Sequence, residues 1–126
     1  MMSKKNNKKA LEKKIQMFKK LNVNKSVSVT LMFLSENGES SSKTIEEATG
    51  LKQPEVSNAV KELSEKGWIT TNKIKTPTAG RPVNFYKIVS PLNEIISSLE
   101  QNEMEKIKES DEIIARLREV VSERNA

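Results

Sequence analysis

The sequence has no cysteine and no histidine among its 126 residues. Without cysteine there is no disulfide framework, no thiolate nucleophile and no cysteine-bound zinc or iron–sulfur site. Without histidine, the commonest metal ligand and the commonest general acid–base are also missing. The sequence shows neither a glycine-rich phosphate loop nor a nucleophile–base pair. We therefore expect a protein that is not an enzyme and that holds no cofactor and no metal ion.

Long apolar runs are also lacking. Apolar residues make up 35% of the chain and aromatic residues only 4%, which suits a small globular domain with charged helices. No apolar run approaches the ~20 residues that span a bilayer. The basic start MMSKKNNKK is not followed by the apolar core of a secretory signal. We expect a cytoplasmic protein with no membrane partner.

Positive charge is concentrated in two segments. The chain carries 22 Lys and Arg against 17 Asp and Glu. Residues 1–30 contain nine lysines and one acid, and residues 67–90 contain four basic residues and no acid, whereas residues 31–66 and 91–126 are net acidic. Blocks of one sign direct an electric field at a partner. The two basic segments therefore predict an anionic partner.

The N-terminal region divides into a basic tail and a helix. Residues 1–9 are expected to form a flexible tail. From Ala10 to Leu21, Leu11, Ile15 and Phe18 recur at spacings of four and three, which is typical of an amphipathic helix.

A second helix is expected over about residues 25–36, with Asn24 as its N-cap. The apolar residues also allow a strand there, because Val27, Val29, Leu31 and Phe33 alternate with other residues. We prefer the helix because of the segments that follow, and Asn37-Gly38 should end it.

The segment from Ser40 to Gly67 has the pattern of two short helices joined by a tight turn. Ser42 can cap the first helix, and Gly50 suits its C-terminal end. Pro54 is well suited to the start of the second helix. Apolar residues then recur at spacings of three and four on one face, namely Val56, Ala59, Val60 and Leu63. This pattern predicts a helix-turn-helix.

Two β-prone runs follow the second helix. Residues 68–71 and 83–89 are rich in aromatic, β-branched and threonine residues, and residues 75–82 between them hold two prolines and a glycine. They predict an antiparallel hairpin directly after the helix-turn-helix, the position of a wing. Trp68, Phe85 and Tyr86 are expected to pack this hairpin onto the helices.

Residues 92–124 are expected to form one long helix. From Ile107 to Val121 the spacing averages 3.5 residues, as in a coiled-coil seam, with Ser110 as its weak position. A domain of this size has no other segment to cover such a stripe, so we expect homodimerisation. The expected dimerisation residues are Leu11, Ile15, Phe18, Leu92, Ile96, Leu99, Ile107, Ile114, Leu117 and Val121.

Residues 57–69, Ser-Asn-Ala-Val-Lys-Glu-Leu-Ser-Glu-Lys-Gly-Trp-Ile, resemble the second helix of winged-helix transcription regulators. With the segment Gly-Arg-Pro-Val-Asn-Phe-Tyr at residues 80–86, the chain looks most like archaeal members of the TrmB-like and MarR-like groups. The resemblance implies a mainly α fold with a small β-hairpin (α+β) and a DNA-binding dimer. The sugar-binding domain of full-length TrmB proteins is lacking here, so a sugar effector is not implied.

This interpretation divides the chain into a tail (1–9), a winged helix-turn-helix domain with a leading helix (10–90) and a C-terminal dimerisation helix (91–126). Its expected DNA-binding residues supply polar, amide and cationic groups for base edges and phosphates. They are Thr44, Gln53, Pro54, Glu55, Ser57, Asn58, Lys61, Lys73, Lys75 and Arg81. For Glu55, an alternative role is only to favour the helix N-terminus.

The expected function is sequence-specific regulation of transcription on double-stranded DNA, by a nucleoid-associated homodimer. The second helix would enter the major groove, and the wing would contact the backbone or minor groove. Two alternatives stay open: a chromatin-type protein of low sequence specificity, and a winged-helix protein-interaction module of the transcription machinery. The sequence names neither an operator nor an effector.

Overall fold

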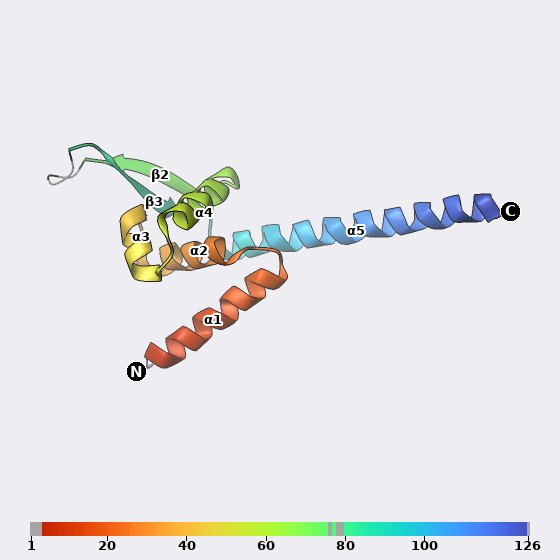
Figure 1. The fold of residues 1–126 in the computed structure, drawn as a ribbon, viewed down its shortest axis with the longest axis horizontal. Helices are drawn as coiled ribbons and strands as arrows, with labels where there is room; N and C mark the ends of the chain where they lie inside the picture. The colour runs from red at the N-terminus through yellow and green to blue at the C-terminus, as the bar shows by residue number, and fades with distance from the viewer. Residues whose placement is uncertain (1–3, 76, 78–79, 126) are drawn as a thin grey trace. The chain divides into compact units, whose positions relative to one another are not determined.

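The computed structural model describes residues 4–75, 77 and 80–125, and the chain divides into two compact units, Met1–Leu92 and Asn93–Ala126. The first unit contains four helices and a small antiparallel sheet among its described residues (Figure 1). The elements run in the order α1 (Lys4–Lys20), α2 (Lys25–Asn37), β1 (Ser40–Ser41), α3 (Ser42–Thr49), α4 (Gln53–Glu65), β2 (Ile69–Ile74), β3 (Val83–Ile88) and α5 (Leu92–Asn125). The expected fold class, mainly helical with a small sheet, is confirmed.

The segment whose apolar residues fit both a helical and a strand repeat forms helix α2. The Oδ1 atom of Asn24 accepts a hydrogen bond from the backbone N–H of Val27 at 2.9 Å, which is the predicted N-cap. Val27, Leu31 and Leu34 are buried on one face of the helix. The predicted helix is confirmed and the strand alternative does not apply, because these three residues follow the helical repeat and the cap starts the helix at Lys25.

Helix α1 is longer than expected. It begins at Lys4, so residues 4–9 form its first turns and are not the flexible tail that the sequence predicts. Lysine is a good helix former, and extending an existing helix costs far less than starting one. Residues 1–3 of the expected tail lie outside the described residues. The last turns of α1 lead through Asn22, which has a positive φ (65°), into α2, against which α1 packs.

The predicted helix-turn-helix is formed by α3 and α4. The N-cap of α3 is Ser41, one residue before the expected Ser42, and its Oγ accepts a hydrogen bond from the N–H of Thr44 at 3.2 Å. Ser41 also belongs to β1, and its extended backbone suits both roles. Gly50 ends α3 at φ 79° and ψ 1°, and its N–H donates to the carbonyl of Glu46 at 2.9 Å.

The wing is confirmed, and the sheet has one strand more than predicted. Strands β2 and β3 pair antiparallel from Ile69 opposite Ile88 to Ile74 opposite Val83. The two-residue strand β1 pairs with β3 on the other side, giving the order β1-β3-β2. Within the first unit, the β2–β3 hairpin extends beyond helices α3 and α4 (Figure 1).

The core of the first unit lies between α2, α3, α4 and the base of the hairpin. Leu31, Ile45, Val56 and Leu63 are completely or almost completely buried, and α2 packs against both helices of the helix-turn-helix. The backbone N–H of Val89 donates to the carbonyl of Trp68 at 2.9 Å, which closes the base of the hairpin. This core holds the exposed face of α4 in one orientation relative to the wing.

The second unit is formed by helix α5. The helix runs unbroken over 34 residues and includes the polar stretch 101–103. At its start Ile95 is buried, whereas from Met104 to Val121 the large apolar side chains are exposed.

Candidate nucleic-acid interface

Helix α4 has one apolar face and one polar face. Its buried residues are the four predicted from the spacing, Val56, Ala59, Val60 and Leu63. The predicted contact residues of the same helix are all exposed, and they are Gln53, Pro54, Glu55, Ser57, Asn58 and Lys61. The amide and hydroxyl groups among them can donate and accept hydrogen bonds at base edges. Packing of the apolar face therefore presents a polar surface along the first three turns of α4, with hydroxyl and amide groups next to one carboxylate and one ammonium.

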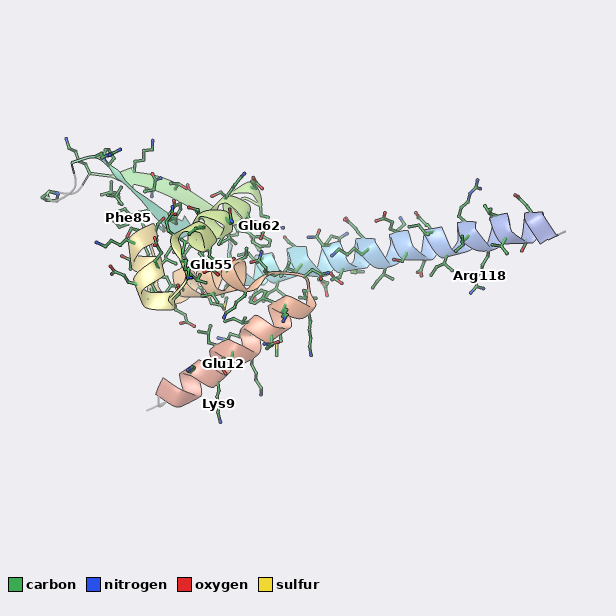
Figure 2. The ribbon with its side chains drawn as sticks, viewed as in Figure 1. Lys9, Glu12, Glu55, Glu62, Phe85 and Arg118 are labelled. Atoms are coloured by element: carbon green, nitrogen blue, oxygen red, sulfur yellow. The ribbon has the colours of Figure 1, made fainter. Side chains whose placement is uncertain are left out.

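The N-terminus of α4 is capped by Glu55. Its carboxylate accepts a hydrogen bond from the backbone N–H of Lys52 at 2.9 Å, and Pro54 occupies the second position of the helix (Figure 2 labels Glu55). This geometry supports the alternative in which Glu55 stabilises the helix N-terminus, since one of its carboxylate oxygens already accepts a hydrogen bond from the backbone. Next to it, the Nε2 atom of Gln53 donates to the Oγ atom of Ser57 at 3.3 Å, so these two polar groups are aligned along the helix.

Thr44 lies exposed in the first turn of α3. Its backbone N–H donates to Ser41 Oγ, and its own Oγ1 accepts from the same hydroxyl at 3.1 Å. The capping contacts fix the orientation of the Thr44 side chain at the start of the helix, where positive dipole density favours an anion. The predicted phosphate contact is consistent with this position.

The wing carries exposed positive charge. Lys73 lies on β2, Lys75 directly follows it, and Arg81 precedes β3, and all three are exposed. On the same strand as Lys73, Asn72 Nδ2 donates a hydrogen bond to Oε2 of Glu39 at 2.7 Å. That hydrogen bond ties β2 to the segment before β1, across the central strand. Within the described residues, none of the three cations forms an ion pair.

The aromatic residues do pack the hairpin, as predicted. Trp68 and Tyr86 are buried and Phe85 is half-buried. The ammonium of Lys66 lies 5.2 Å from the centre of the Trp68 ring, a cation–π contact at the end of α4. Figure 2 shows Phe85 on the hairpin and Glu62 on α4. Glu62 is half-buried and is not one of the predicted contact residues.

Two exposed cations next to the helix-turn-helix were missed from the sequence. Lys43 lies in the first turn of α3, and Lys52 is the N-cap residue of α4. Both stand at helix N-termini, where phosphates bind most readily. The sequence analysis did not single out these two lysines because residues 31–66 as a whole are net acidic. Counting charged residues only at the predicted helix N-termini would have identified both.

The expected dimerisation residues differ in their exposure. On α1, Leu11, Ile15 and Phe18 are half-buried. On α5, Leu92 is half-buried and Leu99 is buried, so Leu99 offers little surface to a second chain, whereas Ile96 is exposed. The distal residues Ile107, Ile114, Leu117 and Val121 are all about half or more exposed. The available apolar surface of α5 therefore lies mainly in its distal part.

Neither a metal cluster nor a membrane span is found in the part of the chain that the structure describes. No group of three or more acidic residues is arranged there to hold a metal ion. No helix there is long and apolar enough to cross a bilayer. The exposed groups are suited to hydrogen bonding and charge contact.

The fold and the polar face of α4 define a winged helix-turn-helix protein. Residues 21–82 match the profile of the MarR family. Over this segment, which is just under half of the chain, the protein is similar to the winged helix-turn-helix domains of the MarR family. No protein with a curated description matches the sequence.

Solved structures share this fold at low sequence identity. A protein of Sulfolobus tokodaii superposes with a TM-score of 0.59 at 22% identity, over 79% of this chain and 96% of that one. A possible transcriptional regulator from Methanosarcina mazei gives 0.56 at 24% identity, over 71% and 78% of the two chains. A variant of MepR from multidrug resistant S. aureus gives 0.53 at 15% identity, over the whole of both chains. These likenesses support the winged-helix fold.

Proposed function

We propose that the protein is a transcription regulator that binds specific double-stranded DNA sequences as a homodimer. In this proposal α4 lies in the major groove, and the β2–β3 wing contacts the backbone or the minor groove. The observation that carries the proposal is the exposed face of α4, where Gln53, Ser57 and Asn58 present neutral hydrogen-bonding groups opposite a buried apolar face. A major groove admits a helix and presents a distinct donor and acceptor pattern for each base pair.

The charge around this face supports DNA as the ligand. Lys43 and Lys52 stand at the starts of α3 and α4, and Lys73, Lys75 and Arg81 are exposed on the wing. Cations at the helix starts and on the wing are suited to contact phosphates, while the polar face of α4 reads the bases. Arg81 is also suited to a narrow minor groove.

A selection experiment tests this function. The full-length protein is incubated with a library of random DNA duplexes, and bound duplexes are recovered and sequenced over several rounds. We expect a pseudo-palindromic site whose half-sites lie about 34 Å apart, or a multiple of that distance, because a two-fold dimer presents two α4 helices to one face of the duplex. Duplexes that bind without any enriched sequence would contradict specific recognition.

One observation favours a second candidate, a chromatin-type protein with low sequence preference. Helix α1 exposes Lys8, Lys9, Lys13, Lys14, Lys19 and Lys20, and such a surface binds any phosphate backbone. The ratio of affinities for a selected site and for bulk DNA separates the two functions. A regulator should give a ratio of at least ~10³, and a coating protein a ratio near one. Failure to bind any duplex at low salt would instead favour a protein-interaction module.

A further inference from the structure

The exposed apolar surface of α5 is wider than a two-residue seam. With Ile114 at heptad position a and Leu117 at d, Ile113 and Val120 fall at position g. Ile113 is 58% exposed and Val120 is 44% exposed. The two e positions of the same stretch are occupied by charges of opposite sign, Asp111 and Arg118. Between residues 111 and 120, one flank of the seam is thus apolar and the other flank is ionic.

The two possible directions of a second copy bring different flanks together. In a parallel pair, each g residue faces an e residue of the other helix, five positions further on. Ile113 would then lie against Arg118 of the second copy, which places an apolar side chain beside a charge. In an antiparallel pair, g residues face g residues and e residues face e residues, so apolar meets apolar and charge meets charge.

We propose that the distal part of α5 pairs antiparallel with the same segment of a second copy. In this pairing Ile114 of each chain packs beside Leu117 of the other, and Ile113 packs beside Val120. Asp111 of each chain then faces Arg118 of the other, which gives two identical ion pairs on the other flank. The proposal rests on the homodimer of the proposed function and adds the direction and register of its helices.

The charges also select one register. A shift by one heptad in one direction would bring Asp111 opposite Asp111 of the second copy, and a shift in the other direction would bring Arg118 opposite Arg118. Like charges placed directly across a helix interface are unfavourable. Only the register centred between residues 115 and 116 satisfies both flanks.

The ionic partners are available for this role. Within the described residues, neither Asp111 nor Arg118 forms an ion pair in its own helix, and both are exposed (Figure 2 labels Arg118). Arg116, two residues earlier, is already 3.7 Å from Glu119 and lies at heptad position c, away from the seam. Arg116 is therefore a matched control for the charge of Arg118.

Spin labels measure the direction of the helices in the full-length protein. The chain has no cysteine, so Glu105→Cys and Glu112→Cys each create one labelling site, and both positions are f positions on the same outer face. At 1.5 Å per residue, antiparallel pairing separates the two labels by about 31 Å along the axis at position 105 and by about 10 Å at position 112. We expect a clearly longer pulsed-EPR distance at position 105. Parallel pairing would give equal distances and would overturn the proposal.

A charge exchange tests the ion pairs. Arg118→Asp should weaken dimerisation about tenfold, because each of the two symmetric contacts changes from attraction to repulsion. The double variant Asp111→Arg/Arg118→Asp should restore the dissociation constant to within about threefold. Arg116→Asp should change it by less than threefold. If the double variant is no better than Arg118→Asp in sedimentation equilibrium, the antiparallel contacts are wrong.

Binding of duplex DNA is measured on the same labelled protein, so that the two proposals fail separately. A DNA-binding dimer with equal distances at both positions overturns the antiparallel pair and leaves the proposed function standing. Unequal distances without DNA binding support the pair and overturn the proposed function. A protein that stays monomeric at the concentrations used for EPR overturns the antiparallel pair and the homodimer together.

Discussion

Thr30 is a buried residue of α2 whose hydroxyl has no hydrogen-bond partner among the described residues. A buried polar group without a partner costs about 1–3 kcal/mol. Thr30→Val keeps the branched shape and removes the hydroxyl, so we expect the free energy of unfolding to rise by about 1 kcal/mol. Thermal or urea denaturation of the two proteins measures the difference.

The neighbouring buried hydroxyl, that of Ser28, provides the control. Ser28 Oγ donates to the backbone carbonyls of Asn24 at 3.2 Å and Lys25 at 3.1 Å. Ser28→Ala removes a satisfied group, and it should not stabilise the protein. A loss of stability in Thr30→Val would mean that the hydroxyl of Thr30 is also satisfied.

Asn58 is the residue whose change should alter sequence preference. Its side chain is exposed in the middle of the polar face of α4, and an amide can form a paired hydrogen bond with adenine. Asn58→Ala should therefore relax the preference at one base position of each half-site, at a cost of about 1–3 kcal/mol for the preferred base. Selection with the variant, compared with the wild type, measures this change.

Arg81→Ala gives the contrasting result. A phosphate or groove-width contact carries little base identity, so the variant should bind all duplexes more weakly and keep the same preferred sequence. If Asn58→Ala leaves the selected sequence unchanged, Asn58 takes no part in reading bases. If Arg81→Ala alters that sequence, Arg81 does more than hold the backbone.

At the scale of elements, the turn between α3 and α4 depends on Gly50. Its φ of 79° lies in the left-handed region, where an L residue is strained, and no atom lies within 4 Å of a Cβ added there. Gly50→Ala should therefore lower stability by about 1 kcal/mol through backbone strain alone. Chemical denaturation measures the loss.

Gly80 in the wing serves as the comparison for Gly50. Its φ lies outside the left-handed region, and an added Cβ would meet nothing within 4 Å among the residues that the structure describes. Gly80→Ala should leave stability unchanged or raise it slightly, because alanine restricts the unfolded chain. An equal loss in both variants would show that backbone strain is not the cause.

The sequence predicted the elements whose signals are local and strong. The apolar spacing of α4, the Asn24 cap and the glycine of the turn are each confirmed in place. Strand β1 was missed because two serines carry no strand periodicity, and they pair only because β3 passes beside them. The sequence predicts Ser42 as the cap of α3, one residue later than the observed Ser41. Both serines are good caps, and the pairing of Ser41 with β3 decides between them.

The candidate site was predicted less completely than the fold. The spacing of buried residues on α4 determined which residues are exposed, so the polar face could be named in advance. The sequence offered two roles for Glu55 and did not decide between them, whereas the structure shows its hydrogen bond to the backbone N–H of Lys52. The hydrogen bond from Asn72 to Glu39 could not be predicted, because it joins side chains 33 residues apart in the sequence. Periodicity shows which face of a helix is exposed to solvent. It does not show which groups on that face already form hydrogen bonds within the protein.

At the scale of the whole molecule, a net charge of +5 combines segments of opposite sign. Cations are exposed on α1, at the starts of α3 and α4 and on the wing, whereas the segment 91–126 is net acidic. A net acidic helix is repelled by DNA, and the proposed antiparallel pair would use its apolar and ionic flanks for a second copy. The charge distribution is thus compatible with one region for DNA and another for dimerisation.

This distribution predicts a strong dependence of DNA affinity on salt. If each protomer neutralises three or four phosphates, the dimer releases the counterions of six to eight, and log K should fall against log salt with a slope of about −6. Fluorescence anisotropy with a selected duplex, from low to moderate salt, measures the slope. Arg81→Ala, which removes one contact from each protomer, should reduce the slope by about 2 in the dimer. A slope near zero would contradict phosphate contact as the source of affinity, and an unchanged slope in the variant would place the wing away from the backbone.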